Sequence, residues 1–196
     1  CQLCQCPDKP MVGSFADITT FSFHPVKIIT SGEGGMCTTN SQDLASLLCQ
    51  FRSHGITRHE HEMTKKPDGP WYYQQINLGY NYRMTDIQGA IGVVQLAKLD
   101  KFIDERDQWA QYYKEQLKDI PWLRTPEKPN GYKHGWQSYV TYIDESCAPM
   151  KRNDIMEFLQ QRGISTRPGT HAVHMLDVYA KMYSIKPQDF PNAFNA

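Results

Sequence analysis

The alternation of apolar and polar residues near the start of the chain predicts a strand, a turn and a second strand. Residues 18–23 read ITTFSF, a run of the β-branched and aromatic residues that are typical of strands. The sequence TSGEGG (30–35) predicts a turn, and Met36–Thr39 predicts a second short strand. Leucines at helical spacing then predict a helix over 43–53, with a capping residue at 40–41.

The middle of the chain carries the longest helical pattern. Apolar residues recur three and four positions apart over 87–103, after a capping signal at 85–86. We expect a further helix to continue through 106–117 and to end near the Ile-Pro pair at 120–121.

The last third of the chain predicts a strand and a helix after a stretch rich in prolines and glycines. The stretch RTPEKPNGYKHG (124–135) is rich in chain breakers and is the expected domain boundary. An alternating strand over 137–143 follows, and then a helix over 152–162, which Gly163 would end.

These elements predict a mixed α/β fold. We expect residues 1–124 to be the end of one domain with its long connecting helices, and residues 125–196 to be the start of a smaller αβ domain. The chain begins with Cys rather than Met and stops at FPNAFNA (190–196) without a finishing element. We therefore expect an internal piece of a longer protein.

The composition narrows the classes of function. Among 196 residues, Lys plus Arg and Asp plus Glu number 21 each, so the formal net charge is zero. This balance argues against binding to nucleic acid or to an anionic membrane, because such surfaces need a basic excess. No apolar run approaches the length of a membrane span. The scattered cysteines Cys37, Cys49 and Cys147 suit a reducing compartment, so we expect a cytoplasmic protein.

Lys27 is the first candidate for chemistry. It stands between a strand-like run and a glycine turn, in FSFHPVKIITSGEGG (21–35). Burial lowers the pKa of a lysine and makes its neutral, nucleophilic amine accessible, as carbonyl chemistry requires. The hydroxyls of Ser22, Thr30 and Ser31 and the N–H groups of the turn would suit a phosphate. From composition alone, the alternative is a surface lysine beside a hairpin turn.

The spacing Ser-Phe-His-Pro-x-Lys-x-x-Thr-x-Gly-Glu-Gly-Gly-x-x-x-Thr resembles one family closely. It is similar to the lysine segment of the DegT/StrS-type sugar-nucleotide aminotransferases, which are fold-type-I enzymes dependent on pyridoxal phosphate. Here the segment reads GSFADITTFSFHPVKIITSGEGGMCTTN (13–40). FRSHGITR (51–58) and GPWYYQQINLGYNYRMTDIQGAIGVVQLAKLD (69–100) resemble the segments that follow it, and RGISTRPGTHAVHM (162–175) resembles the C-terminal domain. The resemblance thus marks the chain as an internal and C-terminal fragment of such an enzyme.

The resemblance implies a fold and a set of roles. Residues 1–124 would be the C-terminal part of the large domain that binds the cofactor, a mixed sheet flanked by helices, and residues 125–196 an incomplete small αβ domain. Lys27 matches the lysine that binds pyridoxal 5'-phosphate covalently and later shuttles a proton. Ser22 matches the hydroxyl that binds the cofactor phosphate. Asn81 matches an asparagine that reaches the phosphate in the neighbouring subunit's site, which implies a homodimer with shared sites.

Two further residues are candidates for binding substrate. Arg83 follows Asn81 in the same motif, and a planar guanidinium suits the oxygens of a diphosphate because it binds them in pairs. His171 lies in GTHAVH (169–174), a segment that resembles one lining the sugar pocket. Packing within a loop is the alternative role for His171.

The implied reaction is a ping-pong transfer of an amino group from glutamate to a keto carbon of a nucleotide-linked sugar. A 4-keto-6-deoxy hexose is the leading substrate class, and polysaccharide biosynthesis is the implied setting. Some relatives carry histidine in place of the lysine and dehydrate sugars, so Lys27 favours the aminotransferase. The alternatives are an inactive or regulatory relative and a fragment without activity.

The start of the chain departs from the family pattern. The family places an aspartate, which pairs with the pyridine nitrogen of the cofactor, and then His or Gln shortly before the segment GSF (13–15). The sequence CQLCQCPDKPMV (1–12) contains no such pair. The earlier half of the family fold and the last part of the small domain also have no counterpart in this chain.

Two clusters raise the question of a metal. Cys1, Cys4 and Cys6 form C-x-x-C-x-C, and His54 precedes an HEH triplet (59–61). Neither cluster has a second ligand pair at the spacing of a zinc site, so we expect no metal site.

Overall fold

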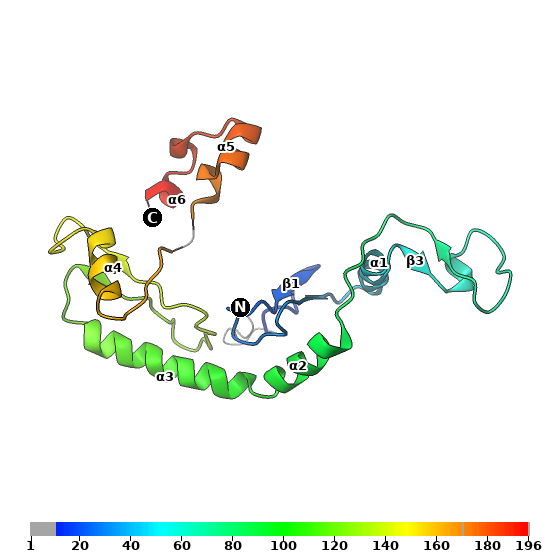
Figure 1. Ribbon diagram of the computed structural model, residues 1–196, viewed down its shortest axis with the longest axis horizontal. Coiled ribbons are helices and arrows are strands. Elements are labelled where there is room, and N and C mark those ends of the chain that lie inside the picture. The colour runs from blue at the N-terminus through cyan, green and yellow to red at the C-terminus, as the bar shows by residue number, and fades with distance from the viewer. Residues whose placement is uncertain (1–10, 170, 196) are drawn as a thin grey trace. The chain divides into compact units, whose positions relative to one another are not determined.

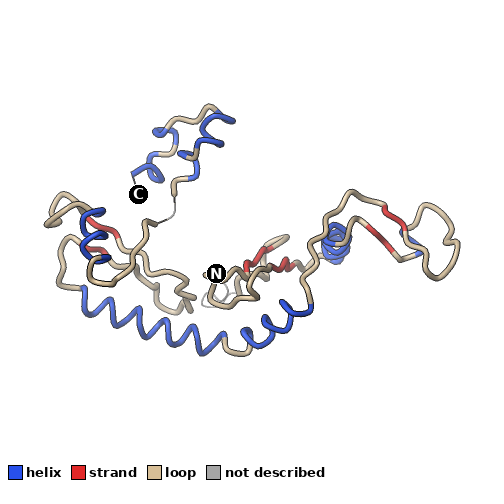
Figure 2. Tube along the Cα trace, viewed as in Figure 1, coloured by secondary structure: helices blue, strands red, loops and turns tan. Residues whose placement is uncertain are grey.

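The computed structural model describes residues 11–169 and 171–195. Figures 1 and 2 show helices and short strands joined by long loops. The helices are α1 (Gln42–Arg52), α2 (Asp86–Leu96), α3 (Leu99–Leu117), α4 (Arg152–Gln160), α5 (Asp177–Tyr183) and α6 (Pro191–Asn195), with short 3-10 turns η1 (Glu60–Glu62), η2 (Val173–Met175) and η3 (Pro187–Asp189). In this part of the chain, no helix combines the length and the apolar character that crossing a bilayer demands.

The chain divides into two compact units. The first unit runs to Leu117 and takes in Pro126–Tyr139, and the second takes in Lys118–Thr125 and everything from Val140 onward. Much of the proline- and glycine-rich stretch that we expected to separate two domains therefore belongs to the first unit. The assignment of the two halves to a large and a small domain stays a prediction.

The described strands form three two-stranded sheets, and every pair is antiparallel. They are β1 (Thr19–Ser22) with β2 (Gly35–Thr38), β3 (Ile56–Thr57) with β4 (Gln74–Gln75), and β5 (Leu123–Arg124) with β6 (Tyr142–Ile143). The first pair confirms the strand, turn and strand predicted from the alternating pattern. A mixed sheet is not among these pairs, so that part of the expected large domain stays a prediction.

The helix starts are set by side-chain caps at the predicted positions. The hydroxyl of Ser41 accepts a hydrogen bond from the Leu44 N–H at 3.3 Å and caps α1. Thr85 and Gln88 form a reciprocal capping box at the start of α2. Gly163, which follows α4, has a φ of 78°, a left-handed conformation that glycine adopts without strain.

The long helical pattern is broken earlier than expected. We predicted one helix over 87–103, but α2 ends at Leu96 and α3 begins at Leu99. Between them the Lys98 N–H donates to the Gln95 carbonyl at 3.0 Å, which tightens the last turn. The break gives α3 its own buried face, because Leu99 and Ile103 are 8% and 1% exposed.

The buried cluster of the first unit lies under the segment that follows β1. Ile28 and Ile29 pack with Leu99 and Ile103 of α3, and Phe23 and Phe102 cover the cluster. This small core fixes the region around Lys27 to the start of α3.

A charged network holds residues 126–139 on α3. Lys128 Nζ donates to both carboxylate oxygens of Asp107 at 2.6 Å, and the Trp136 indole N–H donates to Asp107 Oδ1 at 2.7 Å. Arg106 also donates to the Trp136 carbonyl at 2.8 Å. Burial raises the pKa of Asp107, but the hydrogen bonds from Lys128 and Trp136 outweigh it and leave this pKa below its ordinary value. The carboxylate is therefore ionised at neutral pH and pairs with Lys128.

The second unit contains less strand than the sequence predicts. The strand expected over 137–143 is reduced to Tyr142–Ile143, which pairs with Leu123–Arg124. Its first residues, up to Tyr139, belong to the first unit, so only its end finds a partner strand. The Asp144 N–H donates to the Trp122 carbonyl at 2.8 Å and extends the contact beyond the ladder.

Candidate active site

Lys27 lies in the Lys27 loop, which we define as residues 23–34 between β1 and β2. The ladder continues for one step beyond the strands, because the Phe23 N–H donates to the Gly34 carbonyl at 2.9 Å. The Lys27 N–H then donates to the His24 carbonyl at 2.9 Å and closes a turn. Lys27 is half-buried rather than buried, and its side chain makes no hydrogen bond or ion pair with a described residue.

The residues after Lys27 anchor the loop. Ile28 and Ile29 are 6% and 5% exposed and belong to the cluster with Leu99 and Ile103. The backbone of Lys27 is thus attached to a fixed pair of side chains, while its amine extends from the loop. This arrangement fixes where the amine starts without engaging it in a bond.

The three hydroxyls predicted for a phosphate have different surroundings. Ser22 is exposed at the end of β1, and its Oγ accepts from the His24 N–H at 3.4 Å. Thr30 instead donates to the Phe23 carbonyl at 2.8 Å, and Ser31, which is 1% exposed, donates to the Glu33 carbonyl at 2.9 Å. The hydroxyls of Thr30 and Ser31 therefore serve the loop itself, and of the three only Ser22 keeps the predicted phosphate role as a candidate.

The His24 side chain lies near both Val26 and Glu33 of the same loop. Its Nδ1 accepts from the Val26 N–H at 3.3 Å, which leaves the neutral ring's proton on Nε2. Nε2 lies 3.8 Å from the Glu33 carboxylate, and both side chains are largely exposed. The pair orients the ring across the loop but adds little stability, as is usual for exposed pairs.

Asn81 lies in the Asn81 segment, defined as residues 76–84, which runs past the end of α1. The His54 N–H donates to the Tyr80 carbonyl at 2.8 Å, and the Tyr80 N–H donates to the Phe51 carbonyl at 2.7 Å. Asn81 itself forms an isolated antiparallel bridge with Ser53. Backbone bonds on both sides of Asn81 therefore fix its position along α1.

Glycines allow this segment to cross the chain that leaves α1. His54 and Gly55 both have left-handed φ values, 63° and 70°. A Cβ at Gly55 would overlap the Asn77 carbonyl, and a Cβ at Gly79 would lie 2.5 Å from the His54 carbonyl carbon. No side chain fits between the two strands of backbone, so the crossing needs both glycines.

The sequence did not predict this crossing. The only signal in the sequence is the pair of glycines themselves, Gly55 after a predicted helix and Gly79 in a loop, because glycine permits close backbone approach. The contact between the two glycines remained hidden because it joins positions far apart in the sequence.

The structure does not join Asn81 or Arg83 to Lys27. Both side chains are exposed, and no bond between either of them and Lys27 or Ser22 occurs among the described residues. The chain after Arg83 does approach the Lys27 loop, because a Cβ at Gly34 would lie 2.9 Å from Met84 Cε. The role of Asn81 and Arg83 in a neighbouring subunit's site stays a prediction.

His171 belongs to the second unit and is exposed. Its neighbour His174 is the packed histidine, with 8% exposure, a contact of Nε2 with the Pro187 carbonyl at 3.2 Å, and the Phe190 ring at 5.1 Å. The burial of His174 leaves His171 as the candidate for contact with a sugar, which stays a prediction.

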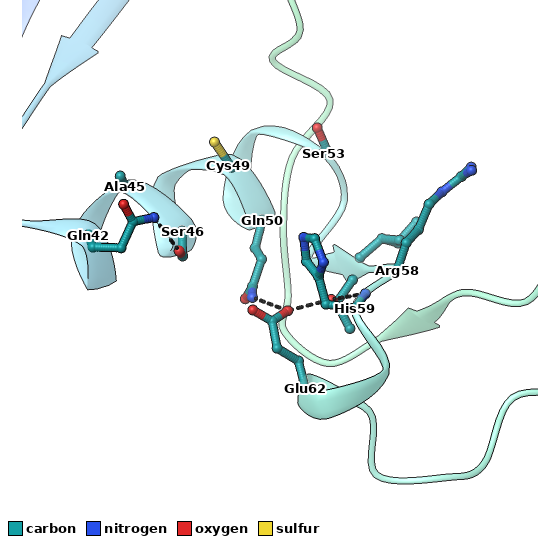
Figure 3. A pocket seen from close by; sticks show the side chains of 11 residues that line it. Gln42, Ala45, Ser46, Cys49, Gln50, Ser53, Arg58, His59 and Glu62 are labelled. Carbon is teal, nitrogen blue, oxygen red and sulfur yellow. Dashed lines mark hydrogen bonds between the residues drawn. The ribbon is translucent and has the colours of Figure 1, made fainter.

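A hollow of about 440 Å³ lies in the first unit, between α1 and the β3–η1 segment. Figure 3 shows the side chains that line it. Glu62 lies in it and accepts from Gln50 Nε2 at 3.1 Å and from the Thr57 hydroxyl. The Thr57 hydrogen bond lowers the pKa of Glu62, burial opposes it, and His59 and His61 lower this pKa further. The carboxylate braces η1 against α1, and none of the predicted site residues lines the hollow.

The two clusters that were weighed as metal ligands differ in whether the structure describes them. Cys1, Cys4 and Cys6 lie outside the described residues. Over residues 11–169 and 171–195, no group of three or more His, Cys, Asp or Glu side chains is placed to hold a metal ion.

The side chains around Lys27 fit the chemistry of pyridoxal phosphate. Lys27 offers an amine that has no bonding partner among the described residues, and Ser22 offers an exposed hydroxyl five positions earlier. An amine suits the aldehyde of the cofactor, and a hydroxyl suits its phosphate. The amine and the hydroxyl thus match the two ends of pyridoxal phosphate, and Lys27 and Ser22 are the residues that would hold the cofactor.

Comparison with known proteins agrees with this chemistry. The chain matches the DegT/DnrJ/EryC1/StrS aminotransferase family over residues 5–196. It is 35% identical to the spore coat polysaccharide biosynthesis protein SpsC of Bacillus subtilis, over 94% of this chain and 48% of that protein. It is 33% identical to GDP-perosamine synthase of Escherichia coli O157:H7, over 90% of this chain and 44% of that protein.

A solved structure shows the same likeness in three dimensions. PseC of Helicobacter pylori, an aminotransferase involved in the biosynthesis of pseudoaminic acid, matches 95% of this chain and 48% of its own, with a TM-score of 0.81 and 27% identity. The likeness supports the predicted α/β fold. The chain spans about half the length of these relatives.

Proposed function

Because this chain belongs to the DegT/DnrJ/EryC1/StrS aminotransferase family, we propose that it forms part of an enzyme that transfers an amino group from glutamate to a nucleotide-linked keto sugar. The position of Lys27 carries the proposal. Its backbone is anchored by the buried Ile28 and Ile29, and its amine makes no bond to a described residue. The names of two relatives, a GDP-perosamine synthase and an aminotransferase for pseudoaminic acid, support a sugar substrate.

Lys27 and Ser22 have distinct tasks in this proposal. Lys27 Nζ holds pyridoxal 5'-phosphate, and the Ser22 hydroxyl binds its phosphate. When bound, the cofactor supplies an electron sink for the carbon that gains or loses the amino group. Lys27 Nζ, once released, holds and moves the proton at that carbon, a role that suits an amine positioned beside the reacting atom.

The remaining site residues complete a shared site. Asn81 reaches the cofactor phosphate bound by a second copy of the protein, so the working unit is a homodimer. Arg83 binds the diphosphate of the nucleotide sugar, and His171 contacts the sugar. The substrate class is a 4-keto-6-deoxy hexose, which rests on the resemblance of the stretches GPWYYQQINLGYNYRM (69–84) and STRPGTH (165–171).

The domain assignment belongs to the same proposal. Residues 1–124 are the C-terminal part of the cofactor-binding large domain, and residues 125–196 are an incomplete small αβ domain. A cytoplasmic location agrees with the free, exposed thiols of Cys37, Cys49 and Cys147.

The test is amino transfer by a protein of the relatives' full length that contains this chain. Glutamate and a nucleotide-linked 4-keto-6-deoxy sugar are supplied, and the formation of 2-oxoglutarate is measured. Lys27→Arg should lower the rate by about 10²–10⁴-fold, because it removes the group that moves the proton. Lys101→Arg, at an exposed lysine of α3, is the matched control and should leave the rate unchanged. Full activity of Lys27→Arg would contradict the proposal.

A further inference from the structure

Within the Lys27 loop, residues 23–31 are closed at one backbone carbonyl, in addition to the Phe23–Gly34 bond that continues the ladder. The carbonyl of Phe23 accepts from the Ser31 N–H at 3.0 Å and from the Thr30 hydroxyl at 2.8 Å. Lys27 lies midway between Phe23 and Ser31. Both ends of the span that presents Lys27 are therefore joined at one oxygen atom.

Thr30 makes a second bond on the far side of this closure. Its Oγ1 accepts from the Gly32 N–H at 2.9 Å, and Gly32 has a left-handed φ of 82°. One hydroxyl therefore holds both the closure at Phe23 and the turn that returns the chain to β2. The hydroxyl of Ser31 makes a different bond, to the Glu33 carbonyl, and takes no part in the closure.

The bond from the Thr30 hydroxyl to the Phe23 carbonyl matters for Lys27 because Thr30 directly follows the buried Ile28 and Ile29. Ile28 and Ile29, which directly precede Thr30, are fixed in the buried cluster. Ser22 lies at the opposite end of the loop, where β1 ends. The Thr30 hydroxyl ties the anchored end to the β1 end, and so it fixes the distance between Lys27 and Ser22.

We propose that Thr30 is a positioning residue for Lys27, which holds the lysine at a set separation from Ser22. The inference rests on the proposed function, in which these two residues bind the two ends of pyridoxal phosphate. Without the Thr30 hydroxyl, the Phe23 carbonyl keeps only its bond from the Ser31 N–H, and the loop loosens. Lys27 then becomes more accessible to small reagents and less suited to the cofactor.

The test compares Thr30→Val, which keeps the shape and removes the hydroxyl, with Thr30→Ser, which restores the hydroxyl. Lys27 and Lys101 are acetylated with trace acetic anhydride in the absence of cofactor, and peptide mapping gives the ratio of their labelling rates. Thr30→Val should raise the Lys27 to Lys101 ratio at least about threefold, and Thr30→Ser should return it to the wild-type value. Borohydride trapping of pyridoxal phosphate at Lys27 should fall about tenfold in Thr30→Val, the size expected for one or two lost hydrogen bonds.

The matched control removes a threonine hydroxyl elsewhere on the same hairpin. Thr38 in β2 donates to the Gly13 carbonyl at 2.9 Å, and Thr38→Val should leave the ratio at Lys27 unchanged. We expect the same result for Thr30→Ala, which replaces Thr30→Val in the test if the valine variant does not fold. Circular dichroism identifies the variants that fold.

The outcomes separate the two proposals. An unchanged labelling ratio in Thr30→Val, an equal change in Thr38→Val, or a failure of Thr30→Ser to restore the ratio would overturn the role of Thr30. If wild-type Lys27 takes up no pyridoxal phosphate, the proposed function fails, and the labelling ratio still decides whether Thr30 positions the lysine.

Discussion

The Lys27 loop and the Asn81 segment both hold a predicted site residue in place, but they differ in how much they depend on side chains. In the Lys27 loop, side chains reinforce the backbone hydrogen bonds, through the buried Ile28 and Ile29 and the hydroxyl of Thr30. In the Asn81 segment, backbone bonds provide it, and the essential side-chain property is the absence of a Cβ at two glycines. The first region should therefore lose its function gradually as side chains are trimmed, whereas the second should fail abruptly when a single carbon is added.

The largest effect is expected at the glycine crossing. Gly79→Ala should lower the free energy of unfolding by about 3 kcal/mol or more, because the added Cβ meets backbone that cannot move aside. Chemical denaturation followed by circular dichroism measures the change. Gly89→Ala in α2 is the matched control, since its added Cβ meets nothing within 4 Å, and it should stabilise by up to about 1 kcal/mol. Equal free energies of unfolding for the two variants would contradict the claim that the crossing leaves no room for a Cβ at Gly79.

An intermediate effect is expected in the anchor of the Lys27 loop. Ile29→Ala should cost about 2–4 kcal/mol, because Ile29 is 5% exposed and the small cluster around it closes only partly over the space. Hydrogen exchange should accelerate at the Phe23 and Ser31 amides and stay unchanged at the Tyr80 amide. Val26→Ala, at a side chain that is 62% exposed, should change stability by less than about 0.5 kcal/mol. Faster exchange at Tyr80 would show that the two regions are not held independently.

The smallest effect is expected when low pH protonates Glu62, and we expect it in the Asn81 segment and not in the Lys27 loop. Gln50 donates to Glu62 and accepts from Asn77 Nδ2 at 2.7 Å, so the carboxylate is linked to the crossing. The hydrogen bond from Thr57 lowers the pKa of Glu62 in the folded protein. The stability that the Glu62 carboxylate contributes is therefore present above the pKa of the unfolded chain, and it is lost as the pH falls through the lower pKa of the folded protein.

Amide exchange at Gly55 and Asn77, corrected for the intrinsic effect of pH, should increase as the pH is lowered from neutral through the titration of Glu62 in the folded protein. The Phe23 and Ser31 amides should keep their protection over the same range. In Glu62→Gln the pH dependence at Gly55 should flatten. A dependence that persists in Glu62→Gln would assign the effect to another group.

The two regions also differ in how far the sequence predicts them. The Lys27 loop could be predicted because its strands, its turn and its lysine lie within one continuous stretch of alternating residues and glycines. The roles of Thr30 and Ser31 were not predictable in the same way, because a hydroxyl suits a phosphate and a carbonyl equally well. Only the fold decides which of the two it meets.

The crossing of Gly55 with Gly79 and the break between α2 and α3 depend on contacts between distant positions. A single sequence records the glycines but not which backbone each one meets. The helical period likewise runs without interruption from 87 to 103, and the break arises because Leu99 and Ile103 turn toward Ile28 and Ile29. The motif thus names the candidate site residues, whose roles stay predictions, and the structure shows the contacts that hold them in place.

The central claim is that the Lys27 loop presents its lysine to pyridoxal phosphate. The most direct measurement is borohydride reduction of the protein with pyridoxal phosphate, followed by peptide mapping, on this chain and on a protein of the relatives' full length that contains it. The account predicts a reduced adduct confined to the peptide of Lys27 and absent from Lys27→Arg. Labelling spread over exposed lysines such as Lys101, or no adduct at Lys27 in either protein, would contradict it.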